Sequence, residues 1–331
     1  MERFALAAAV VLGFALTAAL CSLFVPLRRV LERREQNQQP AQSEQPRPAP
    51  LRAPLWGGLC AAAGTVAAVG VGWLAACVGQ PELLGSEGRL MTRLLTALAG
   101  SLAFGAVGLA EDLARMRSPA ALGLRRDVRL LLEALAAAFV LLLLRAAGCL
   151  PRGLDVPGAG YVLLGSAVPF LWAVLMVVLA ECARIAERDE GTVCGAAFVA
   201  MLALMMAEAG LGVPGLAVLP AALAGALVAL LLWAFPPARL GVGCCGSLLA
   251  AGAIGCIPLS LDMTSLTVPL ALPFWAAGGL WAAQLLGAKR TGKPLRCWVK
   301  KHKMSPETVF LCSFALSAVG YVLALALLRW C

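Results

Sequence analysis

Two adjacent carboxylates, Glu111 and Asp112, follow an apolar stretch and could bind cations or hold phosphates. The stretch before them is long enough to cross a membrane. Five arginines come soon afterwards, at Arg115, Arg117, Arg125, Arg126 and Arg129. Because charge is costly inside a bilayer, we expect this segment at the boundary between membrane and water. The alternative interpretation is an ordinary solvated helix end, where carboxylates are common.

A second charged segment, residues 181–191, reads ECARIAERDEG and follows another apolar stretch. If it is helical, Glu187 and Glu190 share one face and Arg184 lies one turn earlier. We predict that these side chains join Glu111 and Asp112 in one cleft. A salt-bridged helix end in water is the alternative.

Two further segments could bind an anionic group. Residues 241–248 read GVGCCGSL, and their backbone N–H groups could hold a phosphate at a helix N-terminus, although a tight turn that needs glycine is an alternative. The residues of interest there are Gly243, Gly246 and Ser247. The second segment, residues 288–307, carries seven Lys and Arg residues and the only histidine, among them Lys300, Lys301 and His302.

The composition is that of a membrane protein. Apolar residues make up 61% of the 331, and charged residues make up 14%, against about 25% charged residues in a soluble domain. Mean hydropathy is +0.87. Apolar stretches recur along the whole length, and their backbone groups must be satisfied without water, so we expect helices. The predicted fold class is an all-α, polytopic membrane protein.

We predict ten membrane-spanning helices near residues 4–26, 57–79, 90–110, 130–148, 160–180, 192–211, 214–234, 246–261, 265–287 and 308–330. Nine or eleven remain open, because little separates the spans on either side of Asp262. With both termini outside, 21 of the 27 Lys and Arg residues fall in inner loops, which matches the positive-inside rule. Glu111 and Asp112 then face the cytoplasm.

The chain is interpreted as a single transmembrane domain over residues 1–331, with a flexible cytoplasmic loop at 27–56 whose residues 35–55 are rich in Gln and Pro. The basic residues sit in short loops and form no basic domain, so membrane lipid fits them better than nucleic acid. The twelve cysteines are scattered without CxxC spacing, which indicates neither a disulfide framework nor a zinc site.

The order of these segments resembles the polyprenyl-phosphate N-acetylhexosamine-1-phosphate transferases, especially the phospho-N-acetylmuramoyl-pentapeptide transferase branch. The resemblance covers nearly the whole chain. Its segments are APLWGG (53–58), FGAVGLAEDLARM (104–116), GLRRDVRLLLE (123–133), FPPARLGVGCCGSLLAAGAIG (235–255) and TGKPLRCWVKKHKMSPETV (291–309). They are similar to the family's TPTMGG, its FGxxGFxDDYxK and the segment after it, its PAxxFMGDTGSLALGGxxG and its histidine-rich loop.

The resemblance implies a peptidoglycan-type transferase in the inner membrane of a bacterium. Such an enzyme moves a sugar phosphate from a UDP-linked amino sugar onto polyprenyl phosphate and releases UMP. It implies catalytic roles for Glu111, Asp112, Glu187 and Glu190, with Mg²⁺ held by the first three. Substrate binding falls to Arg184, Gly243, Gly246, Ser247, Lys300, Lys301 and His302. Self-association into a homodimer is left open.

This chain departs from the family pattern at the site itself. The paired aspartates appear as Glu111 and Asp112, and the metal-binding aspartate of the MGD motif falls at Cys244, whose sulfur is a poor ligand for Mg²⁺.

Three hypotheses follow: a transferase with an altered site, an inactive relative that binds polyprenyl phosphate or a partner, and an unrelated transporter. In the second, Arg184 or Arg188 supplies the positive charge of the metal. The sequence lacks the internal symmetry of many transporters, which disfavours the third.

Overall fold

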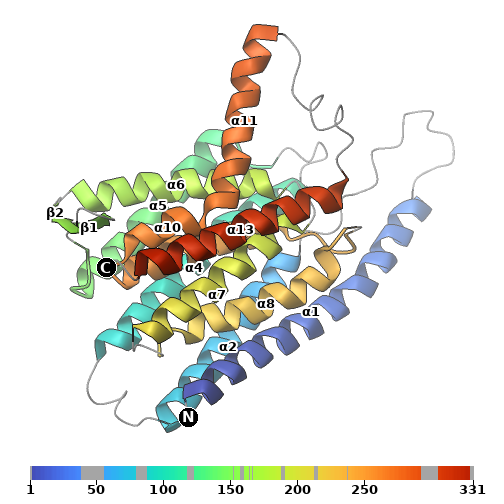
Figure 1. The fold of residues 1–331 in the computed structure, drawn as a ribbon. Helices are drawn as coiled ribbons and strands as arrows, with labels where there is room; N and C mark the ends of the chain where they lie inside the picture. Colours follow the sequence, from blue (N-terminus) through green and yellow to red (C-terminus); the bar gives the residue numbers. More distant parts are fainter. Residues whose placement is uncertain are drawn as a thin grey trace.

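The computed structural model describes residues 2–38, 56–79, 88–117, 123–151, 153–156, 160–163, 165, 167–187, 191–211, 215–236, 238–291 and 305–328. Within these residues the chain is helical apart from turns and one short hairpin (Figure 1). The longer helices are α1 (Glu2–Gln38), α2 (Gly57–Gly79), α4 (Gly88–Arg117), α5 (Arg126–Ala146), α6 (Ala167–Ala186), α7 (Thr192–Gly210), α8 (Val218–Ala234), α9 (Gly243–Ser260), α11 (Leu272–Thr291) and α13 (Pro306–Leu328). The all-α class is confirmed.

Seven of the described helices are long and apolar enough to cross a membrane, or eight if a bent pair forms one span. The bent pair joins residues 264–270, which comprise η1 (Thr264–Leu266) and α10 (Thr267–Leu270), to α11 at an angle of 63°. Of the other two long helices, α8 is shorter and α5 carries more charge. The chain is therefore a multi-pass membrane protein, while the count of ten stays a prediction.

Three segments differ from the expected spans. Helix α4 continues past residue 110 to Arg117, so Glu111 and Asp112 lie on the helix rather than after it. Helix α1 runs on to Gln38, into the loop expected from residue 27, because residues 27–38 contain no glycine or proline to end it. Residues 160–163 form a strand, and α6 starts only at Ala167.

The strands β1 (Gly153–Val156) and β2 (Gly160–Leu163) pair antiparallel, with Leu154 opposite Val162. Val156, Tyr161 and Val162 favour extended structure, and the Pro-Gly pair at 157–158 cannot continue a helix. The predicted span at 160–180 is thus wrong at its start, since its first residues belong to this hairpin. The membrane-length helix occupies 167–186 instead.

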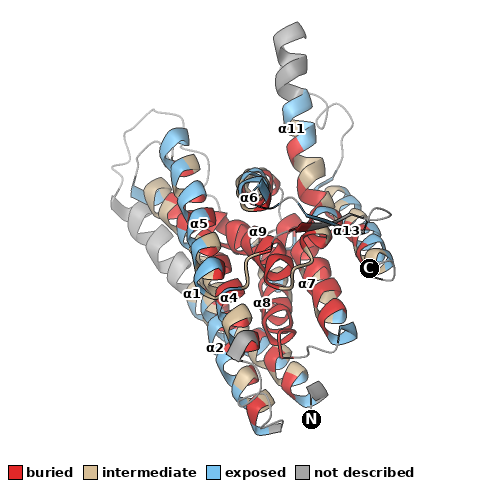
Figure 2. Ribbon diagram, turned by 90° about the vertical axis from the view of Figure 1, so that its left-hand side faces the viewer, coloured by how far each residue is buried: buried red, intermediate tan, exposed pale blue. Residues whose placement is uncertain are grey.

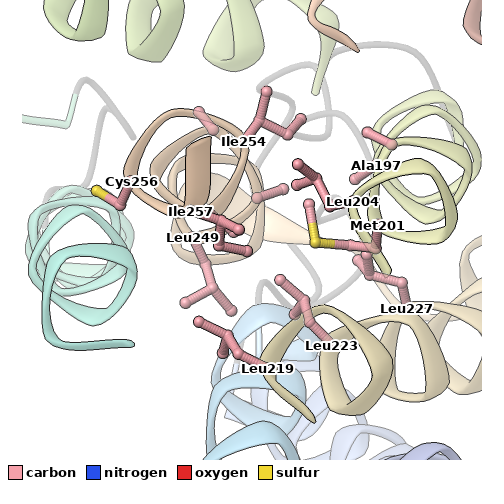
Figure 3. Close-up of a cluster of buried hydrophobic side chains, with 14 of the residues drawn as sticks. Ala197, Met201, Leu204, Leu219, Leu223, Leu227, Leu249, Ile254, Cys256 and Ile257 are labelled. Carbon is pink, nitrogen blue, oxygen red and sulfur yellow. The ribbon is translucent and has the colours of Figure 1, made fainter. Parts of the chain in front are cut away.

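Helix α9 forms the centre of the bundle. All of its residues are buried, and Figure 2 shows the buried positions concentrated in α9 and the helices around it, whereas α1, α5 and α13 are exposed along one side. Figure 3 shows Leu249, Ile254 and Ile257 of α9 beside side chains of α7 and α8. The same view shows Cys256 on the opposite side, where its sulfur lies near Gly100 of α4. A helix buried all round must have small or apolar residues on every face.

Small residues let α4 and α9 approach closely, and these two helices share the most extensive contact in the described structure. A Cβ atom added at Gly108 would collide with the carbonyl oxygen of Cys244, and one at Gly252 would lie 3.0 Å from Phe104 Cβ. Such close contact between backbones is typical of helix pairs in membranes. It sets the distance between Asp112 and the start of α9.

Figure 1 shows α11 rising away from the other helices, while α10 stays against them beside α13. The change of direction occurs at Ala271, between Leu270 and Leu272, where the two helices meet at their 63° bend. Trp275 Nε1 donates a hydrogen bond to the Val268 carbonyl across this bend. This hydrogen bond therefore connects α10 to α11 across the bend.

Replacing Gly108 by leucine should separate α4 from α9, because a backbone carbonyl cannot yield to the added side chain. We expect a loss of at least about 2 kcal/mol in the free energy of unfolding, as for other overpacked sites. Gly70→Ala is the matched control, because no atom of the described residues lies within 4 Å of its Cβ position. It should be neutral or stabilising by up to about 1 kcal/mol. Unfolding of purified protein in detergent measures both, and equal effects would contradict the close α4–α9 contact.

Candidate functional site

The carboxylate of Asp112 binds the first turn of α9. Its Oδ1 accepts the N–H of Cys244 at 3.0 Å, and its Oδ2 accepts the N–H of Cys245 at 2.9 Å. These amides belong to a helix N-terminus, whose first N–H groups have no partner within the helix and carry a partial positive charge. Asp112 is only 1% exposed. A side chain from α4 therefore serves as the N-terminal cap of α9.

Arg115 lies one turn after these carboxylates and faces three of them. Its Nη2 donates to Glu111 Oε1 at 2.7 Å. Its Nη1 lies 3.9 Å from Asp112 Oδ1 and 3.8 Å from Glu187 Oε2. Glu187 directly follows α6, and it also accepts a hydrogen bond from the Cys244 thiol at 3.7 Å. One guanidinium thus links the end of α4 to the end of α6.

A second set of ion pairs adjoins the first. Arg129, on the first turns of α5, donates from Nε to Glu181 Oε1 at 2.7 Å, and its Nη1 lies 3.5 Å from Glu111 Oε1. Arg184 donates to the other oxygen of Glu181. Glu181 is therefore held between two arginines from different helices, and Arg129 connects this set to Glu111.

Glu133 lies one turn after Arg129 on α5 and is fully buried. Its Oε1 lies 4.0 Å from Arg129 Nε, and neither of its oxygens has a hydrogen-bond partner among the described residues. Within the same part of the chain, Glu111 Oε2 is also buried without a partner. Buried polar atoms of this kind are costly, so they often indicate a place where a ligand, water or proton completes the site.

We call these eight residues the charged cluster: Glu111, Asp112, Arg115, Arg129, Glu133, Glu181, Arg184 and Glu187. They come from α4, α5, α6 and the residue after α6, and they meet at the start of α9. Removing one partner from a buried ion pair costs about 3–5 kcal/mol, because the other charge stays buried. The cluster therefore fixes how these helices meet.

The structure brings together Glu111, Asp112, Glu187 and Arg184 of the predicted site residues. It places Gly243 at a positive φ of 72° at the first position of α9. A Cβ at Gly246 would lie 3.0 Å from Gly58 Cα, so the absence of a side chain there permits contact with α2. Ser247 donates its hydroxyl to the Cys244 carbonyl. The Cys244 and Cys245 amides at this N-terminus donate to Asp112.

Other predicted site residues lie outside the described ones, namely Arg188, Glu190, Lys300, Lys301 and His302. Four residues of the charged cluster are not among the site residues expected from the sequence: Arg115, Arg129, Glu133 and Glu181. The spacing from Glu111 to Arg115 is a helical i, i+4 pair and could have indicated the first. The contact between Arg129 and Glu181 joins positions 52 residues apart, and no local pattern reveals it.

Comparison with known proteins places this arrangement in a family. The family model of glycosyl transferase family 4 matches residues 94–262. This chain belongs to glycosyl transferase family 4. The matched range runs from α4 to just past α9 and contains the whole charged cluster, so the family region and the site coincide.

Three relatives show how far the likeness extends, and each is named phospho-N-acetylmuramoyl-pentapeptide-transferase. The Desulforudis audaxviator protein is 34% identical over 170 residues, which are 48% of this chain and 50% of that protein. The Mycobacterium tuberculosis protein is 27% identical over 265 residues, or 72% of each chain. The Synechococcus protein is 31% identical over 215 residues, covering 63% of this chain and 55% of that protein. The match thus spans half of the first relative's length.

Replacing Asp112 by asparagine should destabilise the fold. An amide has one acceptor oxygen, so one of the two buried amides of α9 loses its partner. The cost of such an unsatisfied group is about 1–3 kcal/mol. Asp127→Asn, on the exposed first turn of α5, is the control and should cost less than about 1 kcal/mol. Unfolding in detergent compares the two, and an Asp112 variant as stable as the control would contradict the capping role.

Proposed function

We propose that this family 4 member is an integral-membrane sugar-phosphate transferase. It moves phospho-N-acetylmuramoyl-pentapeptide, or another N-acetylhexosamine-1-phosphate, from a UDP-linked sugar to polyprenyl phosphate. The reaction supplies precursors for the cell wall or for surface glycans. The proposal is supported by the coincidence of the matched region, residues 94–262, with the buried charged cluster. The names of the relatives point to the same reaction.

The charged cluster suits a reaction between two phosphates. Phosphoryl transfer depends mainly on positioning and on neutralisation of charge, so the protein must supply cations close to the reacting oxygens. Arg115, Arg129 and Arg184 are guanidinium groups, whose fork of donors matches phosphate oxygens. Glu111 Oε2 is buried and accepts no hydrogen bond from the described residues, so this oxygen is not committed to another group of the protein there. We assign Glu111, Glu187 and Glu190 to the reacting groups and Asp112 to their placement.

A second candidate function is an inactive relative that binds polyprenyl phosphate or a partner protein. One observation favours it. Both oxygens of Asp112 accept backbone N–H groups, and Glu111 Oε1 faces both Arg115 and Arg129. Carboxylates that are engaged in this way hold helices together and have less freedom to take part in a reaction.

We further propose ten spans in a bacterial plasma membrane, with both termini outside and the charged cluster at the cytoplasmic face. The location of 21 of the 27 Lys and Arg residues in the expected inner loops supports this topology. Single cysteines introduced beside Arg117 and beside Gly153 should react with membrane-impermeant reagents from opposite sides. Labelling of both positions from one side would overturn the ten-span topology.

Formation of UMP separates the two candidate functions. The full chain, purified in detergent, is given a UDP-N-acetyl sugar and polyprenyl phosphate. A transferase should release UMP, and Glu111→Gln should reduce the rate by about 100-fold or more if this carboxylate contacts the reacting groups. The control Asp127→Asn lies on an exposed turn and should keep the full rate. Binding of polyprenyl phosphate without any UMP would favour the inactive relative.

A further inference from the structure

The point at which three carboxylates of the charged cluster meet is occupied by a side chain of the protein itself. The Arg115 guanidinium is 2.7 Å from Glu111 Oε1, 3.9 Å from Asp112 Oδ1 and 3.8 Å from Glu187 Oε2. A cation bound by all three carboxylates would have to share this space. The local negative charge therefore already has a positive partner that is covalently part of the chain.

Arg115 is also held from its other side. Gly123 has a φ of +69°, and a Cβ added there would lie 3.1 Å from Arg115 Cγ and 3.3 Å from its Nε. The backbone at Gly123 thus lies close to the arginine, and a larger residue there would require the Arg115 side chain to shift by a few tenths of an ångström. The side chain of Arg115 is 21% exposed. Carboxylates on one side and backbone on the other fix the guanidinium in place.

The remaining donors do not fit a resident Mg²⁺. This ion binds oxygen atoms at about 2.0–2.1 Å in near-octahedral geometry. Glu111 Oε1 already faces Arg115 and Arg129, and each oxygen of Asp112 accepts an amide of α9. Cys244 offers a thiol, which is a poor ligand for this ion. Among the residues that the structure describes, no group of three or more His, Cys, Asp or Glu side chains is placed to hold a metal ion.

We propose that Arg115 is the resident cation of the charged cluster, in place of the divalent metal that the family resemblance implies. The cluster then holds its carboxylates together and receives phosphate groups through guanidinium ions alone. Arg115 is supplied by the same helix as Glu111 and Asp112, so its charge is present whenever the fold is present. A transferase and an inactive relative would share this feature, and the inference stands apart from UMP release.

Metal binding by the purified full chain tests this inference with Mn²⁺ as the probe, because bound Mn²⁺ loses the paramagnetic resonance signal of the free ion. The unmodified chain should leave the signal of added Mn²⁺ unchanged. Arg115→Ala should bind Mn²⁺ with a dissociation constant at least about tenfold below the highest Mn²⁺ concentration at which the unmodified chain shows no binding, a difference of about 1.4 kcal/mol or more. The variant would lack the guanidinium that lies near Asp112 and Glu187, while Arg129 would still face Glu111 Oε1.

Arg117→Ala is the matched control. It removes the same charge from the exposed end of the same helix, and it should bind no more Mn²⁺ than the unmodified chain. Arg115→Lys keeps a positive charge at the site and should also stay free of Mn²⁺. A gain of binding in Arg115→Ala alone would thus trace to the loss of charge at this one position.

Two outcomes would overturn the proposal. One is binding of Mn²⁺ by the unmodified chain that Glu111→Gln abolishes, since the carboxylates would then hold a metal beside Arg115. The other is a folded Arg115→Ala protein that binds no more Mn²⁺ than Arg117→Ala. If Arg115→Ala does not fold, the unfolding midpoint of the unmodified chain is measured instead, with and without Mg²⁺. The proposal requires that Mg²⁺ leave this midpoint unchanged, because an ion that binds only the folded state raises it.

Discussion

The two hydrogen bonds from the first turn of α9 to Asp112 are the contacts on which the rest of the site depends. They connect the central helix to α4 at the place where glycines bring the two backbones closest. Once Asp112 is fixed, Glu111 and Arg115 have fixed positions on the same helix. The Cys244 thiol is then directed to Glu187. A single carboxylate therefore relates α4, α9 and the end of α6 to one another.

Around this contact the protein balances buried charges with partners from separate segments. Arg129 connects Glu111 to Glu181, and Arg184 completes the pair with Glu181. Such networks contribute little net stability, because each charge gives up its hydration on burial. The same guanidinium groups are suited to phosphate oxygens. Under the proposed function, a phosphorylated substrate would exchange arginine–carboxylate pairs for arginine–phosphate pairs.

Much of the fold could be predicted from the sequence, because long apolar stretches have few alternatives in a membrane. The expected span at 192–211 lies within one residue of α7. The hairpin at 153–163 was missed, since a short apolar strand looks like the start of an apolar helix. The bend at residue 271 was missed because no charge marks it. At residue 271 the local composition stays apolar while the backbone changes direction, whereas at 153–163 the Pro-Gly pair at 157–158 was the available signal.

The site was predictable only in part. Glu111, Asp112 and Glu187 stand out because carboxylates are rare beside apolar spans. Arg115 was grouped with the loop arginines that orient the chain, although its side chain turns back to the carboxylates one turn earlier. Glu133 lies inside an expected span, where its role depends on Arg129 and on the fold around both. Pairings across distant segments come from tertiary structure, which sequence spacing does not encode.

The complete burial of α9 has a consequence for how the protein is made. Its mean hydropathy is 1.6, against 2.4 for residues 4–24 of α1, so it depends on protein neighbours where the outer helices depend on lipid. Those neighbours include α2, α4, α6 and α7, all of which precede it in the chain. During synthesis these four helices are therefore made before α9. Until residues 244 and 245 have been added, Asp112 lacks the two amides that it binds in the finished protein.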